Sequence, residues 1–428
     1  MKFAVFFAHQ LPRPWSEGDE QRLFLEALEQ VELSDRLGIE YCWGQEHNFL
    51  EEYSHSSAPE VFLGAFSQRT KRIRIGHGII HMPPKFNHPA RVAERIATLD
   101  LVSQGRVEWG TGEAGTRIEL EAFGVPYVEK RAMWEEAVRE TARMLCMEPY
   151  SGHKGQYFSF PVRNVVPKPV QKPHPPLWVA CTNRTSLKHA ARHGIGVLTF
   201  AFLDAKEARF WVEEYYETFR RECVPIGRAV NPNVAMLTQF MCHRDADRAV
   251  DLGLEGARFF AFGLSHYYRT GVHVPGQTNV WDAFKRSPPV AMAGNLGLGT
   301  PDEIREHFEA FEEAGVDQLI LLQQAGKYRH EDVCASLELF GREVLPAFKE
   351  RDALRAKRRT ADLAPFVERA LDRLPPLEKP DVLPIESYPV VSKRLGVDLS
   401  QFQQDRAPAP AAMWRLQVGG PKRKQPQS

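Results

Sequence analysis

Short apolar runs alternate with longer amphipathic segments over about the first 350 residues of the chain. A run of about five apolar residues is typical of a parallel strand buried on both faces, and apolar residues three or four positions apart are typical of a helix. The runs that predict strands are residues 2–7, 40–49, 72–80, 106–112, 177–181, 195–200, 234–242 and 317–322. The segments that predict helices are residues 21–37, 58–68, 89–101, 131–147, 186–193, 204–222, 245–260, 300–315 and 332–354.

This alternation predicts an α/β fold, a (β/α)8 TIM barrel with insertions and an extended C-terminal arm. A doubly wound open sheet is the alternative that the same pattern allows. Nothing near the first predicted strand resembles a Gly-x-Gly-x-x-Gly turn, which disfavours a dinucleotide-binding sheet. We therefore predict that residues 1–355 form the barrel.

Three segments break the alternation. Residues 150–176 are rich in Pro, Gly, Lys and aromatic residues and predict a hairpin and loop outside the barrel. Residues 265–299 have weak periodicity, which is typical of a lid, a binding loop or a disordered segment. Residues 356–428 form a C-terminal extension, in which one further helix at 364–374, with Pro365 in its first turn, precedes a Pro-rich arm or disordered tail.

Composition narrows the function classes. Of the 428 residues, 43% are hydrophobic and 26% are charged, which is typical of a soluble globular protein. The 55 Lys and Arg balance the 55 Asp and Glu, so no net charge favours nucleic acid or a membrane surface. The N-terminus turns polar too soon for a signal peptide, and no apolar run is long enough to span a bilayer. Six scattered cysteines without a Cys-x-x-Cys pair indicate a reducing, cytoplasmic setting and no structural zinc.

Polar residues follow four of the predicted strands at the point where each strand ends. They are Glu46-His47-Asn48, Gly76-His77-Gly78, Thr111-Gly112-Glu113 and the run from Cys181 to Ser186. The carboxyl ends of all strands in a barrel meet at one mouth, where active sites lie. We therefore expect these residues to share a cavity, although an isolated histidine such as His47 is more often a rim residue bonded to its neighbours.

The last of these runs has the chemistry of an anion site. Its hydroxyl groups, amide and backbone N–H groups lie at the start of a predicted helix, where the helix dipole favours a phosphate. The residues are Thr182, Asn183, Arg184, Thr185 and Ser186. The same residue types also cap helices, so the residues alone leave both interpretations open.

Five segments stand in an order that matches one known family. They are Glu46-His47-Asn48-Phe49, Arg72-Ile73-Arg74-Ile75-Gly76-His77-Gly78-Ile79 with the helix that starts at Pro89, the run from Leu101 to Gly112, Glu121-Ala122-Phe123-Gly124, and Ala190-Ala191-Arg192-His193-Gly194. Over about residues 1–350 the chain resembles the bacterial luciferase-like family of flavin-dependent monooxygenases.

The resemblance implies a barrel that binds FMN at its C-terminal mouth, with a non-proline cis peptide near Gly76-His77-Gly78. It implies that His47 is the catalytic histidine. The residues that it implies for cofactor binding are His77, Gly78, Thr111, Gly112, Cys181, Thr182, Asn183, Arg184 and Ser186. We expect no metal site, because the cysteines and histidines show no ligand spacing.

The resemblance also implies a two-component reaction. Reduced FMN from a separate flavin reductase reacts with O2 to a flavin C4a-peroxide, which oxygenates a small apolar substrate while the protein excludes water. His47 assists as proton donor or acceptor, and residues 265–299 close as a lid. The expected assembly is a cytoplasmic homodimer without nucleic-acid or membrane partners.

Two residues depart from the family pattern. Asn48 replaces a second histidine, so one imidazole remains at this strand end. Glu113 stands where luciferase has a phosphate-binding arginine. Because a carboxylate repels phosphate, we expect Arg184 or Arg117 to compensate, or Glu113 to point elsewhere.

Three other functions remain open. A deazaflavin-dependent oxidoreductase of the same superfamily would transfer hydride without oxygen, and a non-catalytic partner subunit would not need His47. A metal hydrolase is disfavoured because the histidines show no ligand spacing; they are His47, His55, His77, His81 and His88. The aromatic residues proposed for an apolar pocket wall, although more often core residues, are Phe49, Tyr53, Phe86, Trp109, Tyr267 and Tyr268.

Overall fold

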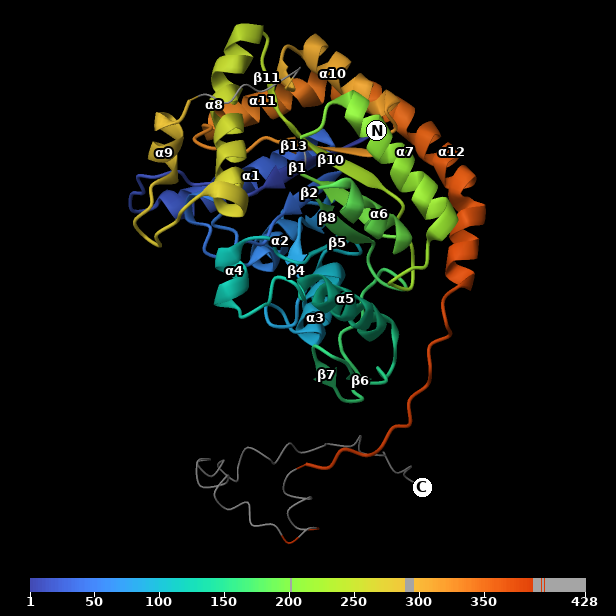
Figure 1. The fold of residues 1–428 in the computed structure, drawn as a ribbon. Helices are drawn as coiled ribbons and strands as arrows, with labels where there is room; N and C mark the ends of the chain where they lie inside the picture. The colour runs from blue at the N-terminus through green and yellow to red at the C-terminus, as the bar shows by residue number, and fades with distance from the viewer. Residues whose placement is uncertain (201, 289–295, 388–393, 395, 397–428) are drawn as a thin grey trace, which may run out of the picture. The chain divides into compact units, whose positions relative to one another are not determined.

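Eight parallel strands close into a barrel (Figure 1). The computed structural model describes residues 1–200, 202–288, 296–387, 394 and 396. The strands follow one another around the barrel as β1 (Lys2–Phe7), β2 (Tyr41–Gly44), β3 (Arg74–His77), β5 (Val107–Gly112), β8 (Leu177–Cys181), β9 (Gly196–Thr199), β10 (Val234–Gln239) and β13 (Gln318–Leu322), and β13 pairs again with β1. The predicted (β/α)8 barrel is confirmed.

Side chains that alternate along each strand fill two cores. On β1, Phe6 belongs to the core inside the barrel and Phe7 to the core between strands and helices. Inside the barrel, Trp43 Nε1 donates a hydrogen bond to Gln318 Oε1 at 2.7 Å. Gly76 makes room for this indole, because a Cβ at that position would lie 2.1 Å from the Trp43 ring.

Helices cover the outside of the barrel (Figure 1). They are α1 (Asp19–Leu37), α2 (Pro59–Ser67), α3 (Pro89–Val102), α4 (Arg117–Ala122), α5 (Lys130–Cys146), α6 (Arg184–Arg192), α7 (Ala205–Glu222), α8 (Ala246–Ser265), α9 (Val280–Arg286), α10 (Pro301–Glu313), α11 (His330–Glu343) and α12 (Leu345–Asp372). Within the described parts of the chain, no helix has both the length and the apolar character needed to cross a membrane.

The two insertions differ from each other. The expected hairpin is present between residues 150 and 176, as the antiparallel strands β6 (His153–Lys154) and β7 (Ser159–Phe160). The segment 265–299 was expected to be irregular, and this is wrong for part of it. It contains a π-helical turn, η2 (His266–Thr270), then α9 and the short strand β12 (Leu298–Gly299), which pairs with β11 (Met241–Cys242); residues 289–295 lie outside the described chain.

The C-terminal helices also differ from the prediction. The single helix expected at 332–354 is two helices, because α11 ends at Glu343 and α12 begins at Leu345, with Pro346 in a permitted first-turn position. Pro365 was expected in the first turn of a separate helix, but it lies inside α12.

The chain divides into two compact units, Met1–Pro380 and Asp381–Ser428. The first holds the barrel and α12. In the second, residues 381–387 have no regular secondary structure. Most of the predicted arm lies outside the described residues.

Candidate functional site

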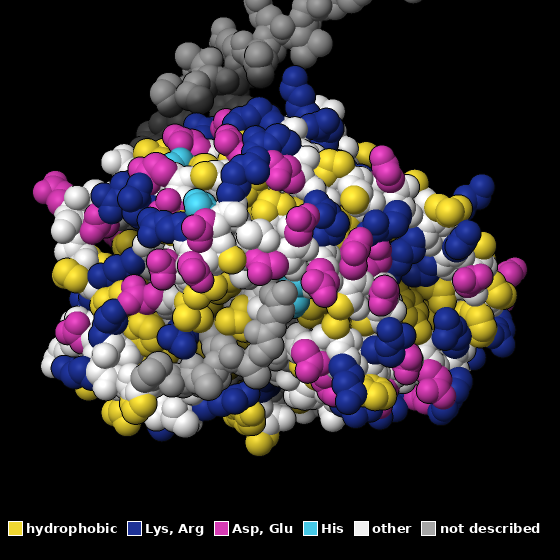
Figure 2. Space-filling model, turned by 90° about the horizontal axis from the view of Figure 1, so that it is seen from above, with side chains coloured by type: hydrophobic (Ala, Val, Ile, Leu, Met, Phe, Trp, Pro, Cys, Tyr) yellow, Lys and Arg dark blue, Asp and Glu magenta, His cyan; other side chains and the backbone are white. Residues whose placement is uncertain are grey.

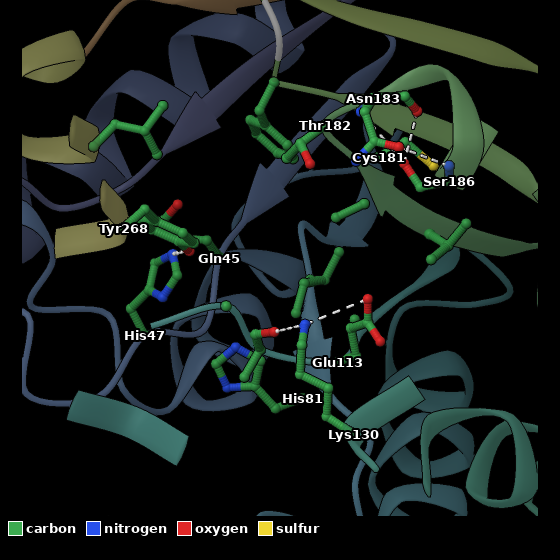
Figure 3. Close-up of a pocket in the computed structure, with 18 of the residues that line it drawn as sticks. Gln45, His47, His81, Glu113, Lys130, Cys181, Thr182, Asn183, Ser186 and Tyr268 are labelled. Atoms are coloured by element: carbon green, nitrogen blue, oxygen red, sulfur yellow. Dashed lines mark hydrogen bonds and ion pairs between the residues drawn. The ribbon is translucent and has the colours of Figure 1, made fainter. Parts of the chain in front are cut away.

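A cavity of about 650 Å³ lies among the C-terminal ends of the barrel strands. Its wall contains seven of the residues predicted for the site, which are His47, Gly78, Gly112, Cys181, Thr182, Asn183 and Ser186. His47 and Tyr268 lie on one side, and the segment from Cys181 to Ser186 lies on the other (Figure 3). The structure therefore brings strand ends that are far apart in the chain to one space.

Three predicted residues do not line this cavity. The side chain of His77 is buried on the other face of its strand, near Glu60 and Arg95. The Thr111 hydroxyl donates to the Trp178 carbonyl oxygen at 2.8 Å. Arg184 points away and pairs with Glu214, at 2.7 Å between Nε and Oε2. Successive strand residues point to opposite faces, so a run at a strand end contributes only alternate side chains to one cavity.

Two glycines let side chains pack closely against the backbone in one wall of the cavity. A Cβ at Gly112 would lie 2.5 Å from Ile79 Cδ1, and a Cβ at Gly115 would lie 2.5 Å from Tyr268 Cε1. The peptide bond between Gly78 and Ile79 is cis, as the resemblance implied for this strand end.

Glu119 fixes which ring nitrogen of His47 bonds a carboxylate. Its Oε1 lies 2.9 Å from His47 Nδ1 and accepts the Asn48 N–H at 2.9 Å, while Oε2 accepts the Thr116 hydroxyl at 2.6 Å. Burial raises the pKa of Glu119, but the adjacent His47 and the hydrogen bonds outweigh this and lower it to about 2. A carboxylate only accepts hydrogen bonds, so Nδ1 of His47 carries the proton. In the neutral ring Nε2 is then an acceptor, 3.4 Å from the Tyr268 hydroxyl.

The sequence analysis did not identify Glu119 as a site residue. The available signal was the Thr-x-x-Glu pattern from Thr116 to Glu119, which marks the start of α4. That pattern indicates a helix start but not which neighbour the carboxylate contacts.

Two further ionisable groups lie in the cavity wall beside His47. Burial raises the pKa of Glu46 to about 7, and hydrogen bonds from the His81 N–H and the Asn87 amide oppose this only in part. Burial lowers the pKa of His81 to about 4, which keeps this imidazole neutral at neutral pH.

Glu113 lines the cavity but is not left as a free anion. Arg131 Nη2 lies 2.9 Å from its carboxylate. Lys130 Nζ lies 3.4 Å from it, as Figure 3 shows. Burial raises the pKa of Glu113, but these two cations outweigh it and lower the pKa. The expectation that Arg184 or Arg117 compensates is wrong, since Arg184 pairs with Glu214 and Arg117 with Glu121. Arg131 and Lys130 carry two positive charges against the one negative charge of Glu113, so this part of the wall has a net positive charge.

The start of α6 is a capped helix that also faces the cavity. Asn183 Oδ1 accepts the Ser186 N–H at 2.9 Å, and the Ser186 hydroxyl donates to the Asn183 carbonyl oxygen at 2.8 Å. The capping interpretation of these residues is therefore confirmed. It does not exclude an anion, because the first turn of a helix still presents N–H groups and a positive dipole end.

Two of the six aromatic candidates, Tyr53 and Tyr268, line the cavity. Trp109 is fully buried elsewhere. Phe49 stacks on Phe123, and Phe86 packs against the same ring at a tilt.

Two groups of potential metal ligands occur among the described residues. One is His47, His81 and Glu119, and the other is Glu135, His189 and His193; within each group the ligand atoms lie within 4.8 Å of one another. In the first group, His47 Nδ1 and Glu119 Oε1 already share a hydrogen bond.

Comparison with known proteins identifies the family. The family model described as luciferase-like monooxygenase matches residues 1–318. The chain belongs to the luciferase-like monooxygenase family. Within this family, the chain is similar to the oxygenase component of the flavin-dependent trigonelline monooxygenase of Acinetobacter baylyi, with 27% identity over 82% of this chain and 96% of that protein.

Solved structures of two monooxygenases and a reductase share the fold. Monooxygenase RslO1 of Streptomyces bottropensis is 26% identical over 81% of this chain and all of that chain, with a TM-score of 0.67. The oxygenating constituent of 3,6-diketocamphane monooxygenase of Pseudomonas putida, in complex with FMN, is 20% identical over 81% and 98% of the chains, with a TM-score of 0.64. A coenzyme F420-dependent tetrahydromethanopterin reductase of Methanopyrus kandleri is 20% identical over 81% and 99%, with a TM-score of 0.59. Structures with this fold thus include monooxygenases and a coenzyme F420-dependent reductase.

Proposed function

We propose that the chain is the oxygenase of a two-component monooxygenase that uses reduced FMN and O2 on a small apolar substrate. The proposal rests mainly on the observation that two groups face the same cavity. The Glu119–His47 pair lies on one side, and the start of α6 with Arg131 lies on the other. The similarity to a trigonelline monooxygenase oxygenase component supports it. The proposal includes a separate flavin reductase, a homodimer and a cytoplasmic location.

The residues of the cavity fit a flavin mononucleotide. Its volume lies within the range of about 300–1,000 Å³ that small-molecule sites occupy. Thr182, Ser186 and Arg131 would hold the phosphate. The positive charges of Arg131 and Lys130 exceed the negative charge of Glu113 there, which favours an anion. Gly78 and Gly112 let Trp43 and Ile79 pack closely into the wall. A flat ring system would lie against this part of the wall. Bound reduced FMN supplies the electrons that activate O2.

His47 would move the proton that the reaction requires. Its Nε2 is an acceptor on the cavity side, and the Glu119 carboxylate stabilises the ring when it becomes a cation. Aromatic and aliphatic side chains surround this half of the cavity and exclude water; they are Tyr53, Ile79, Phe200, Phe202, Leu264 and Tyr268. The apolar character of this half is our reason for proposing an apolar substrate.

A deazaflavin-dependent hydride transfer is the second candidate, and the F420-dependent reductase with the same fold favours it. A non-catalytic subunit would not need the buried Glu119–His47 pair.

Cofactor titration separates these candidates. Fluorescence titration of the full chain with FMN, riboflavin and coenzyme F420 should show FMN bound about tenfold or more tightly than riboflavin, because riboflavin lacks the phosphate. Arg131→Gln should remove most of this difference. Equal affinity for FMN and riboflavin would contradict the phosphate site, and preferential binding of F420 would favour the second candidate.

A further inference from the structure

Tyr268 reaches His47 from a segment that is distant in the chain. It belongs to η2, the π-helical turn after α8, and its hydroxyl lies 3.4 Å from His47 Nε2. The two rings meet edge to face, with centroids 6.2 Å apart and planes at 81°. Gly115 permits this position, because a Cβ there would lie 2.5 Å from the tyrosine ring.

The direction of this hydrogen bond follows from Glu119. The ionised carboxylate requires the proton on Nδ1, so Nε2 of the neutral ring has a lone pair and the Tyr268 hydroxyl must donate. A distance of 3.4 Å is long for such a bond, so the contact orients the ring only weakly.

The segment after η2 is fixed to the turn that follows His47. This turn is η1 (Glu51–Tyr53). Glu51 Oε1 accepts the Gly276 N–H at 2.8 Å and lies 3.1 Å from His273 Nε2. The buried Glu52 carboxylate accepts the N–H groups of Val280 and Trp281 at the start of α9. Two adjacent carboxylates therefore attach residues 266–282 beside the strand end that holds His47.

We propose that Tyr268 is a positioning residue for His47, brought to Nε2 by the docking of residues 266–282 on η1. Glu119 sets the Nδ1–H tautomer, and the docked segment holds the ring orientation through the Tyr268 hydroxyl at Nε2. In the proposed enzyme, Tyr268 would be a lid residue that bonds the catalytic histidine, and this catalytic role rests on the proposed function. The contact between Tyr268 and His47 itself does not depend on a flavin.

Tyr267 offers a matched control for the hydroxyl. It is the adjacent buried tyrosine, and its hydroxyl has no hydrogen-bond partner among the described residues. Tyr268→Phe and Tyr267→Phe each remove one oxygen atom from the same turn. Only the first should affect His47.

The test is 15N NMR of the full chain labelled in histidine, at about pH 8.5 where free histidine is neutral. His47→Gln assigns the signals. The wild-type protein should show His47 with a proton on Nδ1 and a hydrogen-bonded Nε2. Tyr268→Phe should shift the Nε2 resonance toward that of a free acceptor, and Tyr267→Phe should not. An unchanged His47 in Tyr268→Phe, or a proton on Nε2 in the wild type, would overturn the inference.

The docking step has its own variant. Glu51→Gln removes the charge that holds His273 but leaves the His47 side chain untouched. It should produce the same Nε2 change as Tyr268→Phe, and an unchanged His47 signal would show that docking does not position Tyr268.

With reduced FMN and O2, Tyr268→Phe should raise the rate of hydrogen peroxide release about 3- to 10-fold at unchanged FMN affinity, while Tyr267→Phe keeps the wild-type rate. An unchanged release rate would overturn the catalytic meaning of the contact. If the wild type binds no flavin, the proposed function fails, and the NMR result still decides the inference.

Discussion

The orientation of the His47 ring and its tautomer depend on a carboxylate 72 residues away in the chain, because Glu119 Oε1 bonds Nδ1. The position of His47 at a strand end was predictable, because a buried apolar strand that turns polar is visible in the sequence. Its partner Glu119 was not, because a short helix of six residues leaves little periodicity to recognise. The cations beside Glu113 were missed for a related reason. Lys130 and Arg131 start α5, and only the packing of that helix turns them toward the cavity.

The variant Glu119→Gln tests this pair. The amide keeps the shape of the side chain but cannot stabilise a cationic imidazole, so we expect the yield of oxygenated product per reduced FMN to fall about tenfold or more at unchanged FMN affinity. The measurement is the ratio of product to hydrogen peroxide in single turnovers. A variant that couples as well as the wild type would refute the role of Glu119.

His9 makes stability dependent on pH. Its ring is buried against Phe24 and Phe62, and both ring nitrogens lack hydrogen-bond partners among the described residues. Burial, with a smaller contribution from nearby His55, lowers the pKa of His9 to about 3. The unfolded chain therefore binds a proton below about pH 6.5 that the folded chain does not bind until about pH 3, so stability is complete above pH 6.5 and falls as pH decreases.

In His9→Phe this contribution disappears. Between pH 7.5 and pH 5 the wild type should lose about 2 kcal/mol more unfolding free energy than the variant, as measured by urea denaturation. Parallel pH dependences of the two proteins would contradict the burial of a neutral His9.

At the scale of elements, the strands were predicted best. Strands β1 and β8 begin and end at the predicted residues, because a strand buried on both faces leaves an uninterrupted apolar run. Helix α12 was predicted worst. Local sequence rules place Pro365 near a helix start, but the burial of Leu363 and Ala370 on either side of it keeps the helix continuous. The turn η2 was not predicted either, since its π-helical form depends on what its residues contact.

Pro365→Ala should stabilise α12. Proline removes the N–H that would bond the Ala361 carbonyl oxygen, and its ring crowds that turn. We expect a gain of about 1–3 kcal/mol, seen as a higher Tm and increased helical circular dichroism. An unchanged or lower Tm would show that α12 does not run through this position.

At the scale of the molecule, closure of the barrel assembles the site. The ends of β2, β3, β5 and β8 belong to segments spread over more than a hundred residues, and the closed sheet brings them around one cavity. This convergence was predictable from the order of strands and helices. The charge on the face shown in Figure 2 is mixed, with Lys and Arg interspersed among Asp and Glu over the described residues, as the balanced composition predicts.

The most direct test of the central claim is a single turnover of bound reduced FMN. The full chain is saturated anaerobically with reduced FMN and mixed rapidly with O2, while flavin absorbance and hydrogen peroxide are followed. We predict that the protein delays both oxidised FMN and peroxide relative to free reduced FMN, and that Glu119→Gln shortens the delay. Oxidation of reduced FMN at the rate of the free cofactor, with saturating protein present, would contradict the account.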